Sequence, residues 1–122
     1  MELDYEDEAL IKSLLMGRRV TKVNDTTLEL DNGRILKIRG NEGCGGCSSG
    51  WYEIEELNDC PNNAIFNVEF EHTYDGNNYY GGNETYRIFV YAENEKIKLL
   101  EVNGSDGNGY YGSGYWIDVI NE

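Results

Sequence analysis

The stretch TLELDNGRILKIR (residues 27–39) predicts a β-hairpin. Leucine and isoleucine alternate with polar residues along residues 27–30 and again along residues 34–39, which is the period of a strand with one buried face. Asn32-Gly33 lies between the two runs, and this pair tolerates the positive φ angles that a type I′ turn requires. We therefore expect two neighbouring strands of an antiparallel sheet here.

On the N-terminal side of the hairpin, the sequence predicts one amphipathic helix over about residues 4–16. Its apolar residues share one stripe, and acidic residues crowd its first turns, where they favour the positive end of the helix dipole. Gly17 supplies a C-terminal stop. A short strand pattern over residues 20–23 then joins the helix to the hairpin.

On the C-terminal side, strand patterns recur at residues 64–72, 85–92, 97–102 and 115–120, whereas residues 51–57 fit either a short helix or a strand. About seven strands and one helix are expected. The fold class is α+β and mostly β: a curled antiparallel sheet, as a sandwich or partial barrel, with one N-terminal helix packed on it. A chain of 122 residues fits a single domain over residues 1–122, with the β part at about residues 19–120.

The chain is strongly acidic, and its charge is uneven. It has 23 acidic and 10 basic residues and a net charge of -13; residues 41–122 hold 15 of the acids and 3 of the bases, a net charge of -12. Such a field repels nucleic acid phosphates and anionic lipids, and it attracts basic protein surfaces and metal cations. We expect no direct nucleic acid or membrane binding. Solubility alone is the alternative explanation of the charge.

The cellular location is expected to be the cytoplasm. The sequence has no apolar run of the length that spans a membrane and no signal-peptide pattern at Met1. Its three cysteines are too few for a disulfide scaffold, which agrees with a reducing compartment.

The cysteine loop Cys44-Gly45-Gly46-Cys47 is a candidate half-site for tetrahedral zinc. Cys60 and His72, the only histidine, would complete a set of four ligands, with Asp59 or Glu42 as weaker choices. The same spacing serves redox chemistry, although two glycines make a poor helix start, and thiols without a function are a third reading. The expected cofactor is therefore none, or zinc.

Glycine and tyrosine gather in two stretches, residues 74–82 and 103–116. Glycine lets the backbone approach a partner, and tyrosine supplies contact area at low entropic cost. These stretches, with nearby glutamates, predict a surface for a basic protein; rings that cap the core are the alternative. The predicted partner-binding residues are Tyr79, Tyr80, Tyr110, Tyr111, Trp116, Glu53, Glu55, Glu56, Glu69 and Glu71.

Catalytic motifs are absent from the sequence. No G-x-S-x-G elbow or phosphate-binding loop occurs, and Asp106 is the only carboxylate between Asn103 and Ile117, so the calcium loop of EF-hands is excluded. We expect a protein that is not an enzyme.

Six short motifs occur in an order shared with a known group of proteins: LMGR (residues 15–18), LDNG (30–33), NEGC (41–44), IEEL (54–57), YRIFV (86–90) and GNGYY (107–111). Over about residues 15–119 the chain resembles an uncharacterised family of small acidic proteins encoded by bacteriophages and their bacterial hosts. Members often carry adjacent cysteines in place of Cys44-Gly45-Gly46-Cys47, so the resemblance does not support a metal. It implies a setting in which small acidic proteins inhibit a host enzyme or defence system, sometimes by imitating the charge of DNA.

The expected function is that of a phage or prophage accessory protein that inhibits a host nucleic-acid-handling or defence protein, in an anti-CRISPR-like manner that includes DNA mimicry. Its partner would be a host protein with a basic surface, met in the host cytoplasm. The alternative is a protein that binds a small ligand, such as a nucleotide signal, in a scaffold held by zinc. A dimer is compatible with either hypothesis.

Overall fold

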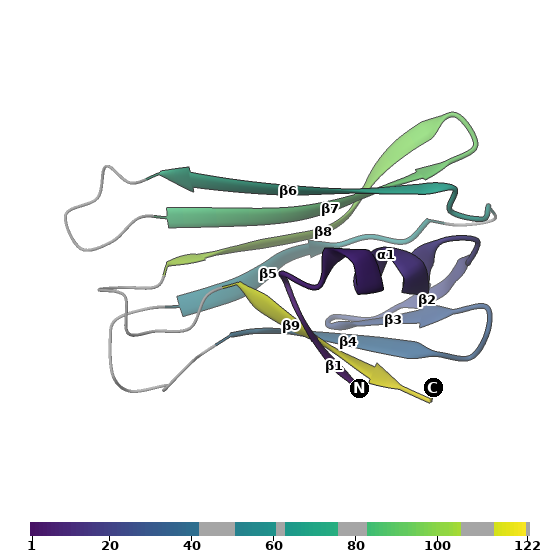
Figure 1. Cartoon of the computed structure of the whole chain (residues 1–122), viewed down its shortest axis with the longest axis horizontal. Helices are drawn as coiled ribbons and strands as arrows, with labels where there is room; N and C mark the ends of the chain where they lie inside the picture. The colour runs from purple at the N-terminus through teal and green to yellow at the C-terminus, as the bar shows by residue number, and fades with distance from the viewer. Residues whose placement is uncertain (42–50, 61–62, 76–82, 106–113, 122) are drawn as a thin grey trace.

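The computed structural model describes residues 1–41, 51–60, 63–75, 83–105 and 114–121. Within these ranges the chain forms two antiparallel sheets and one helix (Figure 1). The elements are β1 (Glu2–Asp4), α1 (Glu8–Leu15), β2 (Val20–Val23), β3 (Thr27–Leu30), β4 (Ile35–Gly40), β5 (Trp51–Leu57), β6 (Asn67–Asp75), β7 (Asn83–Ala92), β8 (Glu95–Ser105) and β9 (Tyr115–Ile120). The prediction of a mostly β fold with one helix is confirmed, as an open sandwich and not a closed barrel.

The two sheets differ in how far apart in the sequence their paired strands lie. The four-stranded sheet has the order β5-β8-β7-β6, and the five-stranded sheet has the order β1-β9-β4-β3-β2. In the five-stranded sheet β9 lies between β1 and β4, so Ile117 pairs with Leu3 on one side and Ile38 on the other. The middle of this sheet is therefore built from segments far apart in the sequence.

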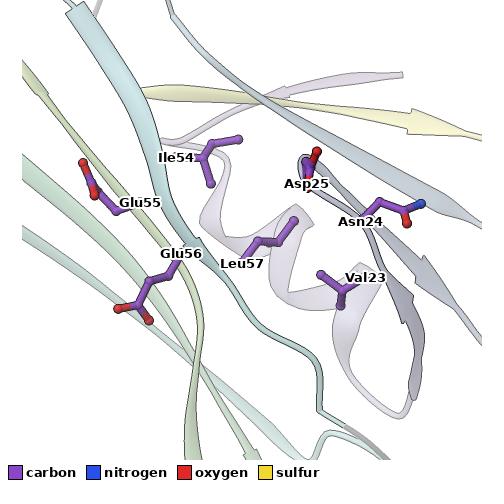
Figure 2. A pocket seen from close by; sticks show the side chains of 7 residues that line it. All are labelled: Val23, Asn24, Asp25, Ile54, Glu55, Glu56 and Leu57. Carbon is purple, nitrogen blue, oxygen red and sulfur yellow. The ribbon is translucent and has the colours of Figure 1, made fainter.

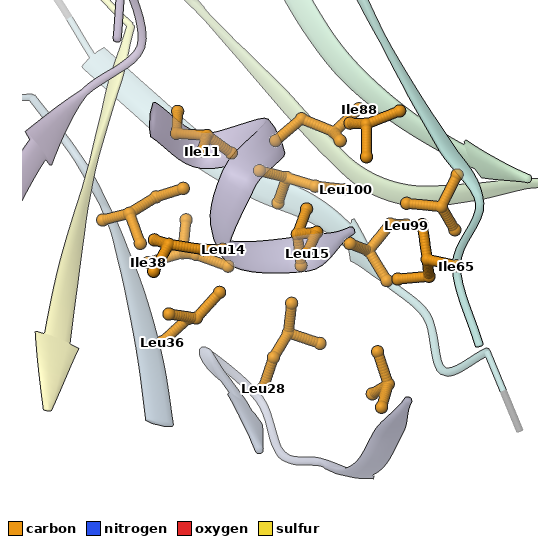
Figure 3. Packing of buried hydrophobic residues seen from close by; sticks show 14 of the residues in the cluster. Ile11, Leu14, Leu15, Leu28, Leu36, Ile38, Ile65, Ile88, Leu99 and Leu100 are labelled. Atoms are coloured by element: carbon orange, nitrogen blue, oxygen red, sulfur yellow. The ribbon is translucent and has the colours of Figure 1, made fainter. Parts of the chain in front are cut away.

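Helix α1 lies between the two sheets, as Figure 1 shows. Its buried stripe is formed by Ile11, Leu14 and Leu15. Figure 3 shows these side chains among Leu28, Leu36 and Ile38 of the five-stranded sheet and Ile88, Leu99 and Leu100 of the four-stranded sheet. Burial of a leucine or isoleucine side chain contributes about 1.5–3 kcal/mol, so the helix fills the core between the two sheets.

The predicted start of the helix is wrong by four residues. Leu3 is 2% exposed and belongs to β1, which pairs with β9, and the helix begins only at Glu8. Residues 4–7 form a turn: the Asp4 N–H donates to Asp7 Oδ2 (2.9 Å), and the Glu6 N–H donates to Asp4 Oδ1 (3.0 Å). Aspartate side chains compete in this way for the N–H groups that a helix would use. The predicted stop is confirmed, since Gly17 follows the helix with φ +77°.

The β3–β4 hairpin is confirmed, but its turn is not of type I′. Gly33 has φ +86°, and Asn32 is not among the residues with positive φ. The Gly33 N–H donates to the Leu30 carbonyl (3.0 Å), and the Leu30 N–H donates to the Arg34 carbonyl (2.9 Å). This is the three-residue loop in which a glycine in the left-handed conformation follows a tight turn.

Candidate functional site: a cleft beside strand β5

A cleft opens between strand β5 and the turn that joins β2 to β3 (Figure 2). β5 and β2 are edge strands of the two sheets as described, so the cleft lies where the sandwich is open at one side. It has a volume of about 650 Å³. We call it the β5 cleft, and its lining residues are Val23, Asn24, Asp25, Ile54, Glu55, Glu56 and Leu57.

The two sheets contact each other closely at one end of β5, so the cleft does not extend to that end. A Cβ atom added at Gly40 would lie 2.7 Å from the carbonyl oxygen of Tyr52, which is closer than real Cβ atoms approach. Glycine is required at this position because β4 meets β5 there. Further along β5, from Ile54 to Leu57, the cleft is open, and the β5–β8 register shifts in a bulge between Ile54 and Glu56.

The β5 cleft is lined by three apolar side chains and by four polar or acidic residues. Val23, Ile54 and Leu57 point into it, whereas the carboxylate groups of Glu55 and Glu56 point away from these three side chains (Figure 2). Asp25 lies across the cleft from them, on the β2–β3 turn. Among the described strands β5 pairs only with β8, so the cleft also offers a strand edge to which an extended segment can hydrogen-bond.

A chain of ion pairs crosses the outer face of the four-stranded sheet. Lys98 Nζ lies 3.1 Å from Glu56 Oε1 and 3.3 Å from Glu101 Oε1, and Arg87 Nε lies 2.6 Å from the same oxygen of Glu101. Arg87 also pairs with Glu71, so the chain runs from β5 through β8 and β7 to β6. Burial raises the pKa of Glu101, but the hydrogen bonds from Arg87 and Lys98 outweigh it, and this pKa lies below its ordinary value.

A second cluster lies on the same face. Lys96 Nζ lies 3.5 Å from Glu69 Oε2 and 4.5 Å from the ring centre of Phe89, and the Tyr91 hydroxyl group donates to Glu69. Lys96, Lys98 and Arg87 are all the lysines and arginines of residues 41–122, so this face engages every basic side chain of the acidic part of the chain.

The predicted glutamates therefore fall into two groups. Glu56, Glu69 and Glu71 are paired with these basic residues. Glu53 and Glu55 are exposed, and neither forms an ion pair within the described ranges. Negative charge without an ion pair in the described part of this sheet therefore lies along β5, beside the cleft, and also at Glu93 and Glu95 of the β7–β8 turn.

Trp116 is the one predicted aromatic residue in the described part of the chain, and it does not join these glutamates. Trp116 lies on the five-stranded sheet between the buried residues Tyr115 and Ile117, and the Arg39 guanidinium lies 5.6 Å from its ring centre. Strand alternation places Trp116 on the outer face of that sheet, away from the four-stranded one. Tyr79, Tyr80, Tyr110 and Tyr111 lie outside the described residues. Trp51, which sequence reasoning missed, is 42% exposed at the start of β5.

The two described members of the predicted zinc set lie apart. Cys60 is fully buried. Burial, and then the charges of Asp59 and Glu95, raise the pKa of its thiol. Glu95 pairs with Ala92 beside the β7–β8 turn, so Cys60 lies near that end of the sheet. His72 pairs with Tyr86, and Tyr86 lies six residues before Ala92 on β7. At the rise of a strand, this places His72 about 20 Å along the sheet from the turn near Cys60. Cys44 and Cys47 lie outside the described residues, and no group of three ligand side chains occurs in the described part.

His72 has a different partner. Its Nε2 atom lies 3.2 Å from Glu84 Oε1, and the other oxygen of Glu84 accepts a 2.5 Å hydrogen bond from the Tyr52 hydroxyl group. The carboxylate of Glu84 thus joins β6 to β5 at the end of the four-stranded sheet that is distant from Cys60.

Comparison with known proteins shows the family of the chain. A family model described as "Domain of unknown function (DUF7448)" matches residues 13–117, so the chain belongs to this family. No curated protein and no solved structure matches it. The predicted membership in an uncharacterised family is confirmed. In the described part of the chain, no helix has the length and apolar character needed to cross a membrane.

Proposed function

We propose that this member of the DUF7448 family is a non-enzymatic, acidic binding protein that engages a basic surface of another protein at the β5 cleft. The observation that best supports this is the distribution of ion pairs. The basic residues of the four-stranded sheet are engaged by Glu56, Glu69, Glu71 and Glu101. Glu53, Glu55 and Asp25 keep charges that attract a basic partner and speed its encounter.

The shape of the cleft suits an extended basic segment. From Ile54 to Leu57, the outer edge of β5 pairs with no other described strand, so it offers main-chain hydrogen bonds to a strand added beside it. Val23, Ile54 and Leu57 offer apolar contact to alternate side chains of that strand. Trp51 is exposed at the end of the same strand, and aromatic residues of this kind carry much of the energy of protein interfaces. Charge would steer the partner, and apolar contact would hold it.

A protein that handles nucleic acid is the proposed partner, because its basic groove is built to accept rows of negative charge. Occupation of that groove would exclude the nucleic acid and inhibit the partner. The phage or prophage setting, with a host defence protein as the target, is part of this proposal and comes from the sequence resemblance.

Displacement of labelled duplex DNA from a panel of nucleases and defence effectors tests this function. We expect the chain to displace DNA from a panel member, with an affinity that falls as salt rises. The double substitution Glu53→Gln with Glu55→Gln should weaken displacement about tenfold, equivalent to about 1.4 kcal/mol.

The matched control is Glu93→Gln with Glu95→Gln, which removes the same charge from the exposed β7–β8 turn. This variant should displace DNA within about twofold of the wild type. Equal weakening by both pairs would show that only net charge matters. Displacement insensitive to salt, or from no panel member, would contradict the proposed partner class.

A further inference from the structure

A second cavity lies on the opposite side of the sandwich, beside the other edge of the four-stranded sheet. It has a volume of about 230 Å³ and lies between the segment that leads into α1 and the inner side of β6 and β7. A cavity of this size suits one side chain and is smaller than the usual pocket for a drug-sized ligand.

Aromatic rings form much of the wall of this cavity: Tyr5, Phe70, His72, Tyr86 and Tyr115. The His72 ring stacks on the Tyr86 ring, with centres 4.2 Å apart and planes 12° apart. Tyr5 approaches Tyr86 at 4.8 Å and 61°, and Tyr115 approaches it at 5.8 Å and 83°. The faces of such rings attract cations.

The rings are fixed by contacts outside the cavity. The bond between His72 Nε2 and Glu84 holds the imidazole, and Tyr52 holds Glu84 from the other side. Tyr5 packs against the backbone at Gly114, where an added Cβ atom would lie 2.4 Å from Cδ1 of Tyr5. The aromatic wall is therefore preorganised, which lowers the entropy that a ligand loses on binding.

The charges around the cavity are also suited to a cation. Glu6 and Glu8, both exposed, contribute to its lining. Arg87 borders it too, but its guanidinium is held by Glu71 and Glu101. Carboxylates at the rim thus have no competing basic side chain inside.

A buried hydroxyl group also borders the cavity. Tyr86 lines the cavity and is 3% exposed. Its hydroxyl oxygen is enclosed and interacts with Glu84 and Tyr5, so it helps to hold the Tyr86 ring in place. Burial and then the charge of Glu84 raise the pKa of Tyr86, so this group stays a neutral hydroxyl.

We propose that this cavity binds the guanidinium group of an arginine side chain from another protein, between the aromatic rings and the carboxylates of Glu6 and Glu8. A guanidinium is planar, stacks on aromatic faces and carries five N–H donors. It therefore matches rings and carboxylates at once, whereas an ammonium group offers a compact point charge. This site is separate from the β5 cleft and does not depend on the function proposed for it.

Titration of the isotope-labelled full chain, followed by NMR signals of its aromatic rings, tests this site. The probe is N-acetyl-arginine N-methylamide, and the matched probe is the citrulline analogue, which keeps the shape and lacks the charge. We expect the arginine probe to shift the Tyr5 and His72 signals in a saturable way and to bind about tenfold more tightly than the citrulline probe. Equal shifts with both probes, or no shift with arginine, would overturn the proposal. A lysine probe that binds as tightly as arginine would contradict the selectivity for guanidinium.

Two variants locate the bound probe without disturbing the core. Glu6→Gln with Glu8→Gln changes exposed side chains only and should weaken arginine binding about tenfold. Glu53→Gln with Glu55→Gln should leave arginine binding unchanged, so failure of this site and failure of the β5 cleft are told apart.

Discussion

The hydroxyl group of Tyr52 donates a 2.5 Å hydrogen bond to Glu84 Oε2 across the backbone of Gly104. Tyr52 lies on β5 and Glu84 on β7, and both pair with Gly104 of the intervening strand β8. The ring of Tyr52 passes over Gly104 so closely that an added Cβ atom would lie 2.1 Å from its Cδ1 atom. A glycine on β8 is therefore what allows side chains from the two strands that flank it, β5 and β7, to meet.

Removal of the Tyr52 hydroxyl should destabilise the fold. In Tyr52→Phe the carboxylate of Glu84, which is 11% exposed, loses its short hydrogen bond. Hydrogen bonds to charged groups contribute about 1.5–3 kcal/mol, and we expect a loss of that order in the free energy of unfolding measured with urea.

Tyr86→Phe is the matched control, because its hydroxyl group lies near Glu84 and Tyr5 but forms no hydrogen bond of good geometry in the described structure. Its free energy of unfolding should fall by less than that of Tyr52→Phe, since no short hydrogen bond to a carboxylate is lost. If both variants lost equal stability, the assignment of the hydrogen bond to Tyr52 would be wrong.

Substitution of Gly104 by alanine should destabilise the chain by about 1–3 kcal/mol, the usual cost of an overpacked core. The new methyl group would meet the ring of Tyr52 and, at 2.3 Å, the carbonyl oxygen of Trp51. Asn103→Ala, one residue earlier on β8, should change the free energy of unfolding by no more than about 0.5 kcal/mol. Thermal melts of the two variants provide the comparison; a tolerated Gly104→Ala would refute the close approach.

The ion pairs of Arg87 should make stability depend on pH. The folded pKa of Glu101 is lowered, so its contribution is fully present above the unfolded carboxyl pKa of about 4.3. That contribution is lost as the pH falls through the folded pKa. In Arg87→Gln we expect a loss of about 1–3 kcal/mol at neutral pH, and a smaller difference from the wild type near pH 3. Urea midpoints at both pH values measure this; a difference that does not shrink in acid would contradict it.

Cys60 should react slowly with alkylating agents in the folded protein. Its side chain is fully buried, and burial together with the charges of Asp59 and Glu95 raises its pKa, so little thiolate is present or accessible. We expect the peptide that contains Cys60 to be labelled at least about a hundredfold more slowly than in urea, as read by mass spectrometry. Equal rates in both conditions would show that the segment is open in the folded state.

The parts of the fold predicted from sequence are those with local signals. Runs of aliphatic and aromatic residues along residues 85–92 and 115–120 predicted β7 and β9, and Asn32-Gly33 predicted the β3–β4 hairpin. The strand at residues 51–57 remained ambiguous because it is rich in exposed glutamate and carries a bulge. β1 was missed because three residues carry no period, and its partner is the distant strand β9.

Only part of the candidate site could be predicted, because only some of its features leave a local signal in the sequence. Composition pointed to the glutamates of β5 and β6, and strand periodicity alone places Glu69 and Glu71 on one face. Their pairing with Arg87 and Lys96 depends on the register between neighbouring strands, which no local pattern encodes. The β5 cleft depends on the packing of two sheets and left no signal in the sequence.

The place of β9 in the five-stranded sheet also bears on how the protein is made. Arg39 on β4 pairs with Trp116 on β9. During synthesis β4 is therefore made long before β9, its neighbour in the sheet. Closing so long a loop is a slow step in folding, whereas β6, β7 and β8 follow one another in sequence and pair in turn. The β3–β4 hairpin should therefore keep an unfinished, exposed edge at β4 while β5 to β8 are being made, until β9 is available to pair with it. That interval is when a chaperone would be needed most.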